Sequence, residues 1–137
     1  MSIIKNYIDI LNSIQSVSKK TELIVVTKNQ PIDNINLLIN LNHLHFGENR
    51  VQEASLKWKN LISNSDVKLH LIGKLQSNKA KDAFEIFHYI HTLDSEKLAK
   101  IFSKSLLLFS LISIIIFILL NLTKLSLIKL LISSKKT

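Results

Sequence analysis

Short apolar runs alternate with longer amphipathic segments over the first hundred residues, and this alternation restricts the possible fold more than any other feature. Runs rich in branched residues predict strands at residues 23–27, 43–46, 67–72 and 89–93. Apolar residues at helical spacing, or a capping residue, predict helices at residues 3–18, from 31 onward, 48–61, 78–87 and 94–103. A helix followed by four strand–helix units indicates parallel strands joined by right-handed crossovers.

The residues that follow the expected strands are the candidates for chemistry, because loops at the carboxyl ends of parallel strands carry the sites in such folds. Lys28 follows the first strand, Asn49 the second and Gly73 the third. Burial lowers the pKa of a lysine and leaves a neutral amine that can form a Schiff base with an aldehyde. The alternative reading is a solvated lysine without a function.

Four strings must be considered together with Lys28. They are VVTKNQP at residues 25–31, FGENRVQE at 46–53, HLIGKLQSNK at 70–79 and IHTLD at 90–94. This set resembles the pyridoxal phosphate homeostasis protein family, which is similar in fold to the N-terminal barrel domain of alanine racemases. The resemblance covers roughly residues 5–103 and stops there.

The resemblance implies a (β/α)8 TIM-type barrel that binds pyridoxal 5'-phosphate as an internal aldimine on Lys28. It also implies that Asn49 lies near the cofactor and that His70 and Gly73 belong to a cofactor-binding motif. The loop residues that match the same motif are Gln76, Asn78 and Lys79. Family members have no known turnover, so we expect a cytoplasmic, non-catalytic protein of cofactor homeostasis. An amino-acid racemase is disfavoured, because it needs an acid/base from a further domain.

The chain departs from the family in two ways. Many members have a second lysine two positions after the Schiff-base lysine, where this chain has Gln30. At 137 residues, the chain is also shorter than the ~250 residues of a complete barrel. We therefore expect about four strand–helix units, a truncated barrel over residues 1–103. The family's phosphate-binding loops belong to its last strands, and nothing in residues 105–137 resembles them, so truncation would impair cofactor binding.

Residues 104–137 have a different composition, with five lysines, no acidic residue and no glycine. Residues 105–123 carry no charge, which leaves three readings: a membrane-anchoring helix, a buried apolar helix, or a sequence produced by a shifted reading frame. The first reading gives an alternative function, a membrane-tethered interaction fragment without catalysis. An exposed edge of the half-sheet also predicts self-association.

Charge and residue types exclude other classes of site. The formal charge of +8 arises mostly in the tail, because residues 1–103 hold 13 basic and 10 acidic side chains. With one arginine and no basic stripe, nucleic-acid binding is disfavoured. The chain has no cysteine, and the histidines are not joined by carboxylates at ligand spacing, which disfavours a metal site.

Several candidate residues have an alternative structural reading. Asn49 could cap the following helix instead of contacting a cofactor. Glu48 and Glu53 are expected at the surface, at the start of that helix. His70 is interpreted as a hydrogen-bonded structural histidine in preference to a ligand, and Trp58 as a core residue. Lys79 and Lys81 are expected on a solvated face.

Overall fold

The computed structural model describes residues 2–63, 66–108 and 110–111. The chain divides into two compact units, Met1–Leu98 and Ala99–Thr137. The first unit contains, in order, α1 (Ile3–Val17), β1 (Val25–Val26), α2 (Ile32–Ile39), β2 (His45–Glu48), α3 (Val51–Ser63), β3 (Lys68–Leu71), a 3-10 turn (Ser77–Lys79), α4 (Ala80–Ile86) and β4 (Tyr89–Ile90).

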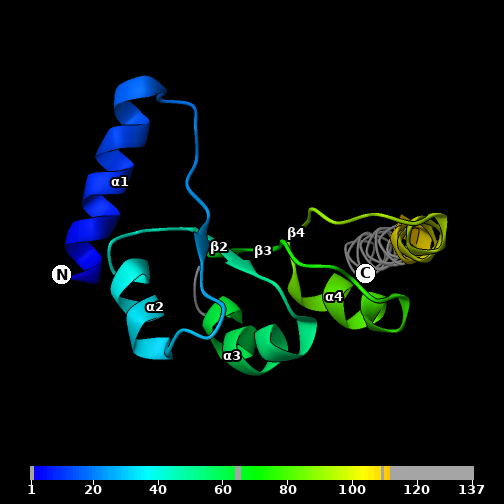
Figure 1. Ribbon diagram of the computed structural model, residues 1–137. Coiled ribbons are helices and arrows are strands. Elements are labelled where there is room, and N and C mark those ends of the chain that lie inside the picture. The colour runs from blue at the N-terminus through cyan, green and yellow to red at the C-terminus, as the bar shows by residue number, and fades with distance from the viewer. Residues whose placement is uncertain (1, 64–65, 109, 112–137) are drawn as a thin grey trace, which may run out of the picture. The chain divides into compact units, whose positions relative to one another are not determined.

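The four strands form one parallel sheet in the order β1-β2-β3-β4. Phe46 of β2 is paired with Val25 of β1 and with Leu69 of β3, and Leu71 is paired with Ile90 of β4. Helices α2, α3 and α4 lie on the same side of the strands (Figure 1). This arrangement confirms the expected α/β fold, in which parallel strands alternate with helices as in part of a barrel.

The core lies between the sheet and its helices. Phe46, Leu69 and Leu71 are fully buried, and the ring of Phe46 packs against that of Trp58 in α3 at 5.0 Å. Trp58 is also fully buried, which confirms its interpretation as a core residue. Burial of aromatic side chains of this size is the main apolar contribution to such a core.

The buried side of α3 is narrower than the sequence suggested. Val51, Ala54 and Trp58 recur at spacings of three and four residues and are buried. Leu56, an apolar residue of the same helix, is 90% exposed. Five residues beyond Val51, Leu56 is rotated by well over a third of a turn from the buried stripe.

The opposite side of the sheet is a separate surface, which we call the inner face. Side chains alternate along a strand, so His45 and Gly47 point away from the helix-facing Phe46. A Cβ at Gly47 would lie 3.1 Å from Ile24 and 3.3 Å from Ile72, which places both on the same side. By register and contact, the inner face comprises Ile24, Val26, His45, Gly47, His70, Ile72, Tyr89 and His91.

Several boundaries differ from the expectations. Gly47 and Glu48 lie within β2, and helix α3 starts only at Val51. Ser77 caps no helix, because it lies inside the 3-10 turn that precedes α4. Residues 96–108 are helical, against an expected start at residue 94, and the hydroxyl of Ser95 accepts a bond from the backbone N–H of Leu98 at 3.3 Å.

Most of the apolar tail falls outside the described residues. The expected division at residue 103, the 105–123 segment and the reading as a membrane anchor therefore stay predictions. Among the residues described, no helix is both long and apolar enough to span a bilayer.

Candidate functional site

Three of the candidate residues follow neighbouring strands at the same edge of the sheet. Lys28 comes two residues after the end of β1, Asn49 directly follows β2, and Gly73 lies two residues beyond β3. Their convergence follows from the parallel pairing, which brings the carboxyl ends of all four strands to one edge. The structure therefore brings the three strand ends to one edge as expected, and the role of these residues stays a prediction.

Lys28 itself is exposed, and the expected burial of this lysine was wrong. The last buried residue of the segment is Thr27, whose N–H bonds to the carbonyl of Gly47 at 3.0 Å. Beyond this bond the chain turns, and Asn29 takes a left-handed conformation with φ 56°. The ammonium of Lys28 forms no hydrogen bond or ion pair with any residue that the structure describes, so it is available to a ligand.

Asn49 and Gly73 join the ends of β2 and β3. A Cβ at Gly73 would overlap with the backbone carbonyl of Asn49, so only glycine permits this approach of the two loops. The side-chain oxygen of Asn49 is buried and has no hydrogen-bond partner among the described atoms. The alternative reading of Asn49 as a cap for the next helix is therefore wrong, and its amide retains hydrogen-bonding capacity.

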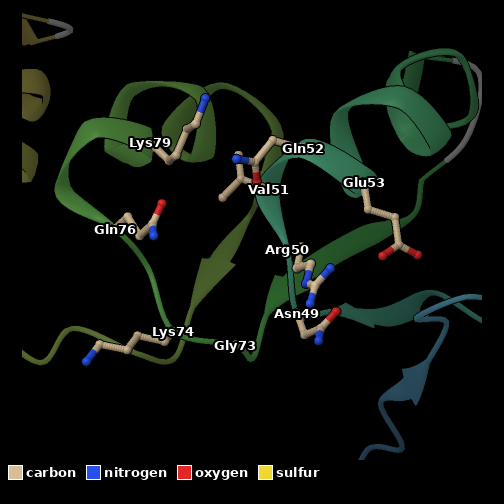
Figure 2. A pocket seen from close by; sticks show the side chains of 9 residues that line it. All are labelled: Asn49, Arg50, Val51, Gln52, Glu53, Gly73, Lys74, Gln76 and Lys79. Carbon is tan, nitrogen blue, oxygen red and sulfur yellow. The ribbon is translucent and has the colours of Figure 1, made fainter.

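An open pocket lies beside this junction. Figure 2 shows that its lining comes from the end of β2, the first turn of α3 and the segment after β3. Its volume of ≈ 660 Å³ is in the range of small-molecule sites. The lining residues are Asn49, Arg50, Val51, Gln52, Glu53, Gly73, Lys74, Gln76 and Lys79. Three of them are basic and one is acidic, which favours an anionic ligand.

His70 is not among the residues that line this pocket, and it belongs to a chain of imidazoles on the inner face. Its Nε2 is 2.9 Å from Nδ1 of His45, and its Nδ1 is 2.9 Å from Nε2 of His91. The ring also stacks on Tyr89 at 4.5 Å. Such contacts agree with a structural histidine. In the described part of the chain, no group of His, Asp or Glu has the geometry of a metal site.

Burial, together with the smaller effects of the neighbouring His45 and His91, lowers the pKa of His70 to about 4. The side chain is only 5% exposed, so the charged form loses most of its hydration. The imidazole is therefore neutral at physiological pH. A neutral ring both donates and accepts a hydrogen bond, as the two histidine neighbours require.

Glu48 is the main residue whose environment was predicted wrongly. We expected a surface position at a helix start, but the side chain is fully buried. Its Oε1 accepts hydrogen bonds from the hydroxyl of Thr27 at 2.7 Å, the ammonium of Lys57 at 2.9 Å and the indole N–H of Trp58 at 3.0 Å. Glu48 lies two residues after Phe46, and in a strand this spacing places both side chains on the same side of the sheet. The spacing was the available signal that Glu48 faces the helices.

Lys57 was not singled out from the sequence. It lies four residues after Glu53 and next to the buried Trp58, so its position beside the apolar stripe of α3 was the available signal. A charged residue at the edge of a buried stripe needs a partner inside the protein.

Comparison with known proteins finds relatives of similar sequence. No protein-family profile matches the chain. Over 86 residues it is 41% identical to the pyridoxal phosphate homeostasis protein of Buchnera aphidicola subspecies Acyrthosiphon pisum, covering 63% of this chain and 43% of the relative. It is 37% identical over 86 residues to the protein of the same name from Synechocystis, covering 63% and 39%.

The structural comparison agrees. PipY of Synechococcus elongatus, solved without PLP, superimposes with a TM-score of 0.59 at 47% identity, over 65% of this chain and 42% of PipY. PipY solved with PLP bound gives 0.58 at 44% identity, over 66% and 43%. The chain thus spans less than half the length of the relatives it matches. Sequence and fold agree on one likeness: over about two thirds of its own length, the chain is similar to pyridoxal phosphate homeostasis proteins.

Proposed function

We propose that this chain binds pyridoxal 5'-phosphate by covalent attachment to Lys28 and serves in cofactor homeostasis without catalytic turnover. The observation that carries the proposal is the free amine of Lys28 at the sheet edge where Asn49 presents an unpartnered amide oxygen. The similar PipY protein has been solved with PLP bound, which supports the same ligand here.

The residues present suit such a ligand. When bound, pyridoxal phosphate supplies an aldehyde that condenses with a primary amine. Lys28 offers that amine, and its exposure gives the aldehyde access. The amide of Asn49 can hydrogen-bond to a polar group of the ring, while Gly73 keeps the end of β3 close to Asn49. The basic Arg50, Lys74 and Lys79 around the adjoining pocket favour a phosphorylated ligand.

The environment of two acidic groups supports the proposed absence of turnover. Glu48 is fully buried, and Oε1 of Glu53 accepts bonds from Asn29 and Lys57, which makes both carboxylates poor candidates for moving a substrate proton. Incubation of the loaded chain with alanine should leave both the enantiomer and the amino group unchanged. Racemisation or transamination above the rate of the free cofactor would contradict this part of the proposal.

Attachment can be tested by trapping. The chain is mixed with pyridoxal phosphate, reduced with borohydride, digested and analysed by peptide mass spectrometry. We expect the label mainly on Lys28, together with absorbance near ~420 nm before reduction. Both signals should be lost in Lys28→Ala and kept in Lys81→Ala, a matched change at an exposed lysine of α4. Equal labelling of all surface lysines would overturn the proposal.

A further inference from the structure

The backbone on both sides of Lys28 is held by one group of charged side chains. On the N-terminal side, the ammonium of Lys57 donates to the carbonyl of Thr27 at 2.7 Å. On the C-terminal side, the N–H of Asn29 donates to Oε1 of Glu53 at 2.8 Å. Lys28, between these anchored residues, has an exposed side chain. The backbone is therefore fixed while the amine stays accessible.

Lys57 connects the two anchors. Its ammonium also donates to Glu48 Oε1 at 2.9 Å and to Glu53 Oε1 at 3.1 Å. An ammonium has three donors, and with the carbonyl of Thr27 all three are used. The side chain is 10% exposed, so these bonds lie largely out of water, where charge-assisted bonds are strong.

Both carboxylates take part in the same arrangement. Oε1 of Glu48 bonds to Lys57 and also to the hydroxyl of Thr27 at 2.7 Å, so the residue before Lys28 is held through backbone and side chain. The N–H of Asn29, followed by the ammonium of Lys57, lowers the pKa of Glu53, which keeps this carboxylate charged. Asn29 adopts a left-handed backbone conformation. It lies in the turn after Lys28, where its N–H bonds to Glu53.

We propose that Lys57, held between Glu48 and Glu53, is a positioning residue for Lys28. These three residues form a clamp that fixes the backbone before and after Lys28 and so orients its amine toward an incoming aldehyde. This inference rests on the proposed function, because the orientation of the amine matters only if Lys28 reacts with the aldehyde. Fixing a reacting group before the reaction lowers the entropy cost of the step.

The test compares the rates at which pyridoxal phosphate labels Lys28 and the other lysines, by borohydride trapping of the full chain at successive times. The other lysines report intrinsic reactivity in the same sample. We expect Lys57→Met to slow labelling of Lys28 by about tenfold or more, with the rest unchanged. Lys81→Met serves as the control and should change nothing.

A second pair of variants separates positioning from general loss of structure. Glu53→Gln keeps an acceptor for the N–H of Asn29 and should label Lys28 at nearly the wild-type rate. Glu53→Ala removes the acceptor and should slow Lys28 alone. Because Glu53 is partly exposed, both variants should fold, which the thermal unfolding midpoint verifies.

The outcomes distinguish the two proposals. If wild-type Lys28 is labelled no faster than the other lysines, the proposed function fails, and the positioning role fails with it. If wild-type Lys28 is labelled preferentially and keeps that preference in both Lys57→Met and Glu53→Ala, the proposed function stands and the clamp is refuted. A lost preference in Glu53→Ala that Glu53→Gln restores would support the clamp.

Discussion

The two faces of the sheet differ in how their buried polar groups are stabilised. On the helix-facing side, Glu48 is fully enclosed and is balanced by the cation of Lys57. On the inner face, neutral imidazoles bond to one another, and residues such as Val26 and Tyr89 stay about half exposed. Neighbouring residues of one strand thus lie in unlike environments. A paired charge suits the covered side, whereas groups without net charge suit the open side.

The largest expected difference between the faces concerns their aromatic side chains. Trp58→Ala should lower the free energy of unfolding by about 3–5 kcal/mol, because the indole is fully buried and its removal leaves a cavity. Tyr89→Ala on the inner face should cost about 1 kcal/mol, since that ring is 48% exposed. Urea denaturation of both variants measures the contrast. Equal losses would mean that the inner face is covered in solution.

The buried charge pair gives the next largest effect. Lys57→Met leaves the carboxylate of Glu48 buried without a cation and should cost about 3 kcal/mol. Adding Glu48→Gln removes that charge, so the double variant should recover part of the loss, with a coupling energy of about 1–3 kcal/mol. A double-mutant cycle in urea measures this energy. Additive effects would show that the two side chains do not interact in solution.

The two glycines are expected to differ in how much stability is lost when each is replaced by alanine. Gly73→Ala should cost about 1–3 kcal/mol, because the methyl group would overlap with the rigid backbone of Asn49. Gly47→Ala should cost less than about 1 kcal/mol, since its neighbours, Ile24 and Ile72, are side chains at 3.1 and 3.3 Å that can shift. Thermal unfolding of the two variants tests the order. A larger loss at Gly47 would contradict it.

The remaining difference is the response of the inner face to acid, which is spread over a range of pH. In the folded chain the pKa of His70 is about 4, below the 6.5 of an unfolded histidine. The unfolded chain therefore binds more protons between these values, and stability falls as the pH drops below 6.5. The slope is up to about 1.4 kcal/mol per pH unit and vanishes below pH 4.

Unfolding midpoints measured from pH 7 to pH 5 check this response. His70→Phe, which keeps a planar ring against Tyr89, should flatten the profile. Lys81→Ala should leave the slope unchanged. A profile that stays as steep without the imidazole would assign the acid response to other groups.

Much of the fold was predictable from local pattern. The order of helices and strands, the core position of Trp58 and the meeting of Lys28, Asn49 and Gly73 at one edge follow from periodicity and parallel pairing. The four strings at residues 25–31, 46–53, 70–79 and 90–94 pointed to the family they resemble. These features depend on residues near one another in the sequence, or on a general rule of parallel sheets.

The clamp and the imidazole chain were not predictable in the same way. Glu48 was assigned to a helix because the strand continued two residues further than its apolar run. The partners of Lys57 lie four, nine and thirty residues away, and only the packed fold brings them together. The histidines meet because each strand is staggered against the next, and that register is a property of the sheet.

The imidazole chain also links the tautomers of distant rings. Nε2 of His45 lies 3.5 Å from the carboxylate of Glu22, which can only accept, so this contact favours a proton on that nitrogen. In neutral rings Nδ1 of His45 then accepts from Nε2 of His70, and Nδ1 of His70 accepts from Nε2 of His91. A carboxylate beside β1 thereby favours one set of tautomers along the chain of rings, as far as the residue after β4.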